Sequence, residues 1–438
     1  MEGVVSKLAN IVILYDGKAR EMDTDMLLLY ELSRRGHKVD LFQLRELNRR
    51  KFFFNTPDLV ITPFLYGDYE LNKFIYKTFG HVKKICNLQW EQVYIGSSKK
   101  ESKSTPKQEA TKAVHICWGQ ESYERLKRNG CSHAVLTGAP HLDFLKSKFA
   151  TWHKSRQELF SYYNIDSSKK TLLFISSFSY LSIDDKILEG IRHLTDVDPI
   201  FFKELTIASR NIILEWFDKF LTDREEDVNV IYRPHPGELI DDKLSNLCEK
   251  HKSLYYISDY SVQQWITVSD IILNWYSTSV VDAFFANKSN LFLRPIEIPA
   301  EIEYEIFQNI CKCKTYEDFL SFIDMPQLVD EYYKKFLLEK SINTYYLVED
   351  SYSYLKIVDL VERMLTTQDF DLKDDGLYSS YSHFTTHLDY AFKYLTYVVL
   401  KNTGLKKFKD YKKMYDVNEE ISAQERTECI NRLKKLPL

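Results

Sequence analysis

The sequence predicts an α/β fold of two lobes, each built on a parallel sheet. Short apolar runs alternate with amphipathic helical segments along most of the 438 residues, a pattern typical of parallel sheets flanked by helices. A chain of this length exceeds one hydrophobic core. Gly and Pro are few, at 13 and 11 residues, which argues against long linkers. We therefore expect most of the chain to be folded.

The first lobe is expected over residues 1–150. It opens with a strand, a helix and a strand over 10–43, in which NIVILYDG forms the first strand and Gly36 ends the helix. Further short apolar runs occupy 58–64, 84–88, 115–118 and 134–137. Helical or loop segments separate these runs, so they are expected to extend one Rossmann-like parallel sheet.

The second Rossmann-like lobe is expected over residues 165–300. Its predicted strands are TLLFISSF, VNVIYR, LYYIS, DIILNW and NLFLRP, with helices near 201–220, 239–250, 262 and 278–286. After Pro299 the pattern is helical throughout. Residues 301–438 are therefore expected to form a helical C-terminal region that can pack back on the lobes.

Composition excludes several classes of function. The net charge of −4 gives no global attraction for nucleic acid. The seven Cys have neither disulfide-framework nor zinc-finger spacing, so reduced thiols and no metal site are expected. A secretory leader and an apolar run near the roughly 20 residues of a membrane span are both missing, which predicts a cytoplasmic protein. The chain also lacks a Walker A loop and a G-x-G-x-x-G fingerprint, which argues against P-loop and dinucleotide chemistry.

The strongest local signal is VNVIYRPHPGE at 228–238, where an apolar strand ends in Arg-Pro-His-Pro-Gly-Glu. Ligands of open α/β sheets bind beyond the carboxyl ends of strands. Arg233 offers a planar cation and His235 a titratable donor, both suited to phosphate. Pro236 stiffens the turn, and Gly237 permits a close backbone approach. The pattern is typical of an anion clamp; the alternative is a rigid turn in which Glu238 caps a helix.

A second signal is Ser277-Thr278-Ser279, which follows the strand DIILNW and precedes an apolar helix. Hydroxyls and backbone N–H groups at a helix N-terminus can bind phosphate. Ordinary N-capping is the alternative. In the first lobe, CNLQWEQVYIG places Glu91 just after a predicted strand. A carboxylate there can act as the general base for an acceptor hydroxyl, and a solvated loop Glu is the alternative.

Four segments in a fixed order resemble a known family: ICWGQESYERLKRNG, LTGAPHLDFL, YRPHPGE and SDIILNWYSTSVVDAFFANK. They are similar to the bacterial surface-carbohydrate biosynthesis transferases, which include the Kdo transferases of capsule and O-antigen assembly. More distant likeness extends to polysialyltransferases and CDP-glycerol glycerophosphotransferases. The resemblance covers residues 85–295 and implies the GT-B fold, in which a cleft separates two Rossmann-like lobes.

The resemblance also implies roles for individual residues. His235 and Pro236, with the turn at 277–279, would hold the nucleotide phosphate, and Glu238 would approach the ribose. Glu91 would serve catalysis with His235. Cations and N–H groups would stabilise the departing phosphate while a carboxylate aids the acceptor hydroxyl. Neither a metal nor a cofactor is required beyond the nucleotide-sugar donor, expected to be CMP-linked.

The expected function is transfer of a sugar, such as Kdo or another ulosonic acid from its CMP form, to a surface polysaccharide or lipid-linked glycan. The QWEQ string around Glu91 differs from the more acidic string of the Kdo enzymes, so the donor sugar stays open. Three alternatives remain: a CDP-glycerol or polyol-phosphate transferase, a sugar-nucleotide epimerase of the same fold, and a non-catalytic glycan-assembly protein.

The C-terminal tail AFKYLTYVVLKNTGLKKFKDYKKMY interleaves Lys with aromatic and aliphatic residues. Basic amphipathic helices of this composition can lie on an anionic membrane surface. Peripheral contact with the inner membrane is therefore expected, with packing against the lobes as the alternative. The lysines in question are Lys393, Lys401, Lys406, Lys407, Lys409, Lys412 and Lys413.

Overall fold

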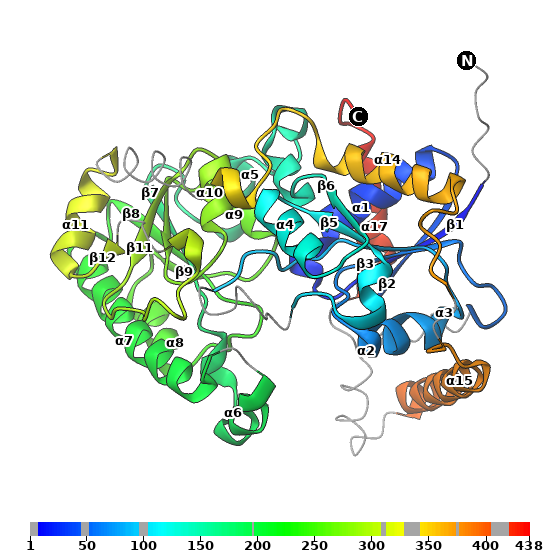
Figure 1. Cartoon of the computed structure of the whole chain (residues 1–438). Coiled ribbons are helices and arrows are strands. Elements are labelled where there is room, and N and C mark those ends of the chain that lie inside the picture. Colours follow the sequence, from blue (N-terminus) through cyan, green and yellow to red (C-terminus); the bar gives the residue numbers. More distant parts are fainter. Residues whose placement is uncertain are drawn as a thin grey trace. The chain divides into compact units, whose positions relative to one another are not determined.

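The structure, a computed structural model, divides into two compact units. Unit 1 comprises residues 1–92, 104–143 and 345–438, and unit 2 comprises residues 93–103 and 144–344. Each unit contains one six-stranded parallel sheet flanked by helices (Figure 1). This architecture confirms the predicted α/β class with two Rossmann-like lobes. The described residues are 8–44, 52–95, 104–194, 197–307, 312–327, 342–373, 376–403 and 420–438.

The sheet of unit 1 has the order β2-β1-β3-β4-β5-β6. The strand β1 has β2 on one side and β3 on the other, so the direction in which successive strands are added to the sheet reverses at β1. The carboxyl ends of β1 and β3 therefore form a topological switch point. The central strand β1 is buried on both faces, as expected of a parallel strand between helical layers. The strands are β1 (Asn10–Tyr15), β2 (Lys38–Gln43), β3 (Leu59–Thr62), β4 (Ile85–Asn87), β5 (Val114–Cys117) and β6 (His133–Leu136).

Helices from both ends of the chain cover this sheet. The helix α1 (Lys18–Arg34) packs against α14 (Ser353–Thr366) and α17 (Ala423–Leu433). The helix α15 (Ser380–Thr403) packs against α3 (Lys77–Phe79) (Figure 1). The C-terminal helices are thus part of unit 1.

A close backbone contact brings the returning chain onto unit 1. The N–H of Leu347 donates to the carbonyl of Trp118 at 2.6 Å. A Cβ at Gly119 would lie 2.3 Å from the carbonyl carbon of Tyr345. Gly119 is therefore needed for the approach of two backbones, because any side chain would displace one of them.

The sheet of unit 2 has the order β12-β11-β10-β7-β8-β9. Its first strand lies between β8 and β10, so the switch point falls at the ends of β7 and β10. The expectation of helix throughout after Pro299 is wrong at β12, which pairs with the end of β11; two residues are too short to show an alternating pattern. The strands are β7 (Lys170–Ile175), β8 (Val228–Arg233), β9 (Leu254–Tyr256), β10 (Ile271–Asn274), β11 (Ser289–Leu293) and β12 (Lys312–Cys313).

Seven of the described α-helices lie wholly within unit 2. The longest, α7, begins at Pro199 behind Asp198, whose carboxylate accepts from the N–H of Ile200 at 3.1 Å; Pro at the first position and Asp at the cap are favoured at helix starts. One core packs Leu173, Ile231 and Ile272 from the sheet against Trp265 of α9. The helices are α5 (Arg156–Tyr163), α6 (Asp185–Ile191), α7 (Pro199–Arg224), α8 (Asp242–Lys250), α9 (Val262–Val268), α10 (Val280–Phe285) and α11 (Tyr316–Asp324).

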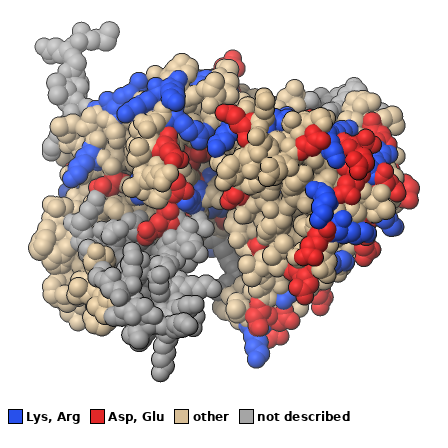
Figure 2. Space-filling model, turned by 180° about the vertical axis from the view of Figure 1, so that it is seen from behind, with Lys and Arg blue, Asp and Glu red and all other residues tan. Residues whose placement is uncertain are grey.

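The surface carries both signs of charge. On the face shown in Figure 2, Lys and Arg side chains are interspersed with Asp and Glu. Within the described parts of the chain, no helix combines the length and apolar composition that a membrane span requires. The cysteines that the structure describes are free thiols.

Candidate active site

Three neighbouring strands of unit 2 end level with one another. Ile175 of β7 is the register partner of Arg233 of β8 and of Asn274 of β10. The loops that follow therefore leave the same edge of the sheet side by side, and two of them are the predicted turns at 233–238 and 277–279. Because the switch point lies between β7 and β10, this carboxyl edge is where a ligand of such a sheet binds.

A buried carboxylate supports the turn at 233–238. Glu238 accepts a hydrogen bond from the Tyr232 hydroxyl at 2.5 Å and another from the Ser176 hydroxyl. It also accepts from the backbone N–H of His235 at 3.3 Å, while its own N–H donates to the carbonyl of His235 at 2.8 Å. Burial, followed by the charge of Glu238, raises the pKa of Tyr232. This network fixes the backbone on which the His235 side chain stands.

Arg210 of α7 also supports the turn at 233–238. Its Nε lies 3.7 Å from Oε1 of Glu238, and its two terminal nitrogens each donate to Asp241 at 2.8 Å. The Glu238 side chain has no exposed surface. In this conformation the carboxylate thus faces the interior, and contact with a ribose would require it to leave these partners.

His235 occupies the exposed tip of the turn, followed by Pro236, which is also exposed. Its Nδ1 accepts from the N–H of Gly237 at 3.1 Å. An accepting Nδ1 carries a lone pair, so the proton of the neutral ring is on Nε2. The neutral His235 ring therefore carries its donor on Nε2, at the carboxyl edge of the sheet.

Arg233 points into the protein. Its guanidinium donates to the carbonyl of Asp259 at 2.8 Å and to that of Tyr260, and it is only 7% exposed. Burial lowers the pKa of Arg233 to about 10. The side chain thus holds the loop before α9, where Tyr260 has a φ of 63°. In this conformation Arg233 shapes the site and is not placed to contact a phosphate.

The turn at 277–279 is held by Asn274 at the end of β10. The Asn274 side chain donates to the carbonyl of Ser277 at 2.9 Å and accepts from its N–H at 2.8 Å. The Ser277 hydroxyl accepts from the N–H of Ser279 at 3.2 Å, and Thr278 is exposed. Ser279 precedes α10 without a side-chain capping hydrogen bond, and the capping contact in this turn is made by Ser277. The helix begins at Val280, two residues later than expected.

Glu91 lies in unit 1, in the loop after β4. Its carboxylate is 56% exposed and lies 3.8 Å from Nη1 of Arg20. The Tyr66 hydroxyl lies 3.5 Å from its Oε2. Since Arg20 follows β1 and Tyr66 follows β3, Glu91 lies at the carboxyl edge of this sheet, beside its switch point.

Three charged residues of α1 were missed from the sequence. Arg20 pairs with Glu21 at 2.7 Å, and Glu21 accepts from the N–H of Asp16 at 2.8 Å. Asp25, one turn later, is fully buried; burial, followed by the charge of Glu21, raises the pKa of Asp25. The available signal was the charged segment KAREMDTD directly after the first strand, where a helix begins at the ligand-binding edge.

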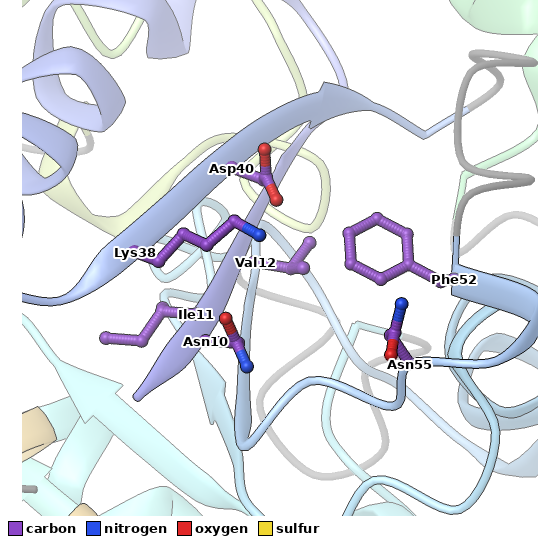
Figure 3. Close-up of a pocket in the computed structure, with 7 residues that line it drawn as sticks. All are labelled: Asn10, Ile11, Val12, Lys38, Asp40, Phe52 and Asn55. Atoms are coloured by element: carbon purple, nitrogen blue, oxygen red, sulfur yellow. The ribbon is translucent and has the colours of Figure 1, made fainter. Parts of the chain in front are cut away.

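A cavity at the other end of the same sheet contains none of the predicted site residues (Figure 3). Asn10 and Lys38, which line it, are the first residues of β1 and β2. It therefore lies toward the amino ends of these strands, opposite the edge at which ligands of parallel sheets bind.

Two Rossmann-like lobes define a protein of the GT-B fold, as predicted. A structure of the wall teichoic acid polymerase TagF, a variant soaked with CDPG, matches with a TM-score of 0.54 and 11% identity over 83% of this chain and 90% of that chain. A UDP-N-acetylglucosamine 2-epimerase matches with a TM-score of 0.50 and 14% identity over 81% of this chain and 95% of that chain. No family model and no curated protein sequence matches the chain.

Proposed function

We propose that the chain is an enzyme that transfers a sugar from a nucleotide-linked donor to a surface polysaccharide or lipid-linked glycan. One observation carries this proposal: the turns at 233–238 and 277–279 leave the switch-point edge of unit 2 at the same level. Their exposed residues include His235 and Thr278. These are hydrogen-bond donors of the kind that bind a diphosphate or phosphate oxygen.

In the proposed reaction, an acceptor hydroxyl oxygen forms a bond to the anomeric carbon of the donor. The bond from that carbon to the nucleotide phosphate oxygen breaks, and the phosphate leaves with the electron pair. Nε2–H of His235 and the turn at 277–279 stabilise its developing charge, while Glu91 takes the proton of the hydroxyl. Glu238 and Arg233 act as positioning residues, because both are bonded to groups inside unit 2.

A CMP-linked ulosonic acid such as Kdo is our first choice of donor, on the motif resemblance. The shared fold with TagF supports a second candidate, transfer of glycerol phosphate or polyol phosphate from a CDP-linked donor. The shared fold with the epimerase supports a third, in which a UDP-sugar is converted with no acceptor present. All three would place the nucleotide at the same edge of unit 2, so the nucleotide is the first property to test.

The experiment is a thermal-shift screen of CMP-, CDP- and UDP-linked donors, since a ligand that binds only the folded state raises the melting temperature. We expect one nucleotide class to stabilise the protein, and His235→Ala and the double change Ser277→Ala/Thr278→Ala to remove that shift without lowering the ligand-free melting temperature. Thr222→Ala, an exposed hydroxyl on α7, is the matched control. An unchanged shift in both site variants would exclude the proposed nucleotide site.

We further propose contact of unit 1 with an anionic membrane, through which the enzyme would reach a lipid-linked acceptor. Lys406, Lys407, Lys409, Lys412 and Lys413 lie outside the described residues, and Lys393 of α15 pairs with Asp389 at 2.6 Å. The support comes from an apolar stripe on α15, whose members recur every three or four residues and are 46–78% exposed, as on helices that lie at an interface. The stripe consists of Tyr381, Phe384, Leu388, Phe392, Leu395 and Val399.

A further inference from the structure

An aromatic cluster lies beside Glu91 at the carboxyl edge of unit 1. Trp90 precedes Glu91, and Trp118 follows β5. The His141 ring lies 5.6 Å from that of Trp90 and 5.0 Å from that of Trp118, and Tyr346 stacks on Trp118 at 5.8 Å. We call Trp90, Trp118, His141 and Tyr346 the aromatic cluster.

Two donors in the aromatic cluster have no acceptor. Within the described part of the chain, the indole Nε1 atoms of Trp90 and Trp118 are buried without a hydrogen-bond partner, and each residue is 6% exposed. Buried indole N–H groups are normally paired, because an unmade hydrogen bond destabilises the folded state. Unlike Trp275 in the core of unit 2, Trp90 and Trp118 adjoin each other, with ring centroids 6.3 Å apart, so one ligand with acceptor oxygens would pair with both donors.

The charges around the aromatic cluster restrict that ligand. Arg20 is shared by the carboxylates of Glu21 and Glu91 at 2.7 and 3.8 Å. Arg125, which donates to the carbonyl of Gln92, pairs with Glu121. His141 adds no positive charge at neutral pH, because burial lowers its pKa to about 3. Two cations among three carboxylates leave a net negative charge around the cluster, which disfavours a carboxylate on the ligand.

We propose that the aromatic cluster binds the acceptor of the proposed transfer reaction, and that this acceptor ends in an uncharged sugar ring. The inference rests on the proposed function and adds the acceptor class. Two oxygens of this sugar would accept hydrogen bonds from Nε1 of Trp90 and Trp118. Another hydroxyl would then lie beside Glu91, the proposed base.

Fluorine NMR of the full chain labelled with 5-fluorotryptophan tests the proposal. The chain has six Trp, each assigned by its Phe variant, and Trp275 in the core of unit 2 is the internal reference because its Nε1 is also buried and unpartnered. The probes are methyl glucoside and methyl glucuronide, which differ by one carboxylate. We expect methyl glucoside to shift the Trp90 and Trp118 signals but not the Trp275 signal, and methyl glucuronide to bind about tenfold more weakly or worse.

Two variants separate the donor groups from the charge. Trp118→Phe keeps a ring and removes one N–H, and should weaken methyl glucoside binding about fivefold, the effect of one neutral hydrogen bond. Trp216→Phe on α7, far along the chain in unit 2, is the matched control and should leave binding unchanged. Glu91→Gln removes one carboxylate and should reduce the difference in affinity between methyl glucoside and methyl glucuronide.

Unshifted Trp90 and Trp118 signals with every uncharged glycoside, or equal binding of methyl glucuronide, would overturn the inference. Nucleotide binding, measured by thermal shift on the same samples, distinguishes the two proposals. A protein that binds the nucleotide but shows no sugar-dependent signal keeps the proposed function and loses this acceptor site, whereas loss of nucleotide binding removes the proposed function itself.

Discussion

Asp282 lies in the first turn of α10, directly after the turn at 277–279, and its carboxylate is buried. Gln263 donates to it at 2.7 Å, yet burial raises the pKa of Asp282 to about 6, against an ordinary value of 3.8. The folded state therefore holds the proton more tightly than the unfolded state. Ionisation of Asp282 must destabilise the fold as the pH rises from about 4 to about 6.

Asp282→Asn should remove the loss of folding stability that ionisation of Asp282 causes. We expect the variant to be more stable than the parent by about 1–3 kcal/mol at pH 8 and nearly equal to it at pH 4. Urea unfolding at the two pH values measures the difference. Asp242→Asn, an exposed residue in the first turn of α8, is the control. A stability difference that does not change with pH would contradict the burial argument.

Glu91 is exposed, so its substitution should affect the reaction more than the fold. If Glu91 is the base, Glu91→Gln should lower turnover by a factor of about 10² or more and leave donor binding almost unchanged. Steady-state kinetics with the nucleotide-linked donor, combined with thermal shift, separates the two effects. The control is Glu124→Gln on the surface of α4 (Gln120–Arg128). An equal loss of binding and turnover would give Glu91 a structural role.

At the level of single residues, the sequence predicts where a residue lies in the fold better than it predicts which way its side chain points. The motif YRPHPGE could be placed at a strand end from its apolar run and its prolines. Whether Arg233 and Glu238 point outward or inward depends on partners distant in sequence, namely Asp259 and the Arg210 side chain. Arg20 was missed for the same reason, because only the sheet order brings the end of β1 near the loop that carries Glu91.

At the level of elements, strands with strong apolar patterns could be predicted and short ones could not. The central strands β1 and β7 read IVILY and TLLFI and are buried on both faces, so composition alone identifies them. The two residues of β12 form a strand only because β11 offers an open edge. The start of α10 is displaced from the expected one because the Asn274 side chain holds Ser277 in a turn.

A substitution at Gly119 tests the contact between the end of β5 and the segment at 345–347. In Gly119→Ala the new Cβ would meet the backbone of Tyr345 and Tyr346 at 2.3–2.5 Å, so the segment at 345–347 must move. We expect a loss of about 3 kcal/mol or more, as for severe overpacking, measured by thermal and urea unfolding.

Gly190→Ala is the matched control for this test. Gly190 lies within α6, and a Cβ there would meet no atom within 4 Å. This change should be neutral or slightly stabilising, because Ala favours helix over Gly. Equal behaviour of the two variants would show that the segment at 345–347 yields easily and that the close contact is not important for stability.

At the level of the whole molecule, both sheets place a switch point where the candidate residues gather. In unit 1 the helix after β1 carries Arg20, and the loops after β3 and β4 carry Tyr66 and Glu91. In unit 2 the loops after β8 and β10 carry the two turns. The alternation of strand and helix predicts two such sheets. It does not predict that residues 345–438 belong to unit 1, because that depends on long-range contacts such as the one between Leu347 and Trp118.

The proposed membrane contact is a property of the whole chain and is tested on the whole chain. Sedimentation with liposomes of graded anionic content should show binding that rises with the anionic fraction, because each Lys near such a surface contributes on the order of 1 kcal/mol. Two variants divide the contributions. Changing Lys406, Lys407, Lys409, Lys412 and Lys413 to Glu should remove the dependence on lipid charge.

The second variant, Leu388→Gln/Phe392→Gln, removes apolar area from the exposed stripe of α15 and should weaken binding at every lipid composition. Its control is Ile187→Gln/Phe201→Gln, which changes two apolar residues of unit 2 that are 58% and 44% exposed. If the stripe inserts at the interface, only the α15 pair lowers binding; if exposed apolar area anywhere suffices, both pairs do. Binding that ignores lipid charge and all these substitutions would remove the membrane from the proposal and leave α15 as a helix that packs on α3.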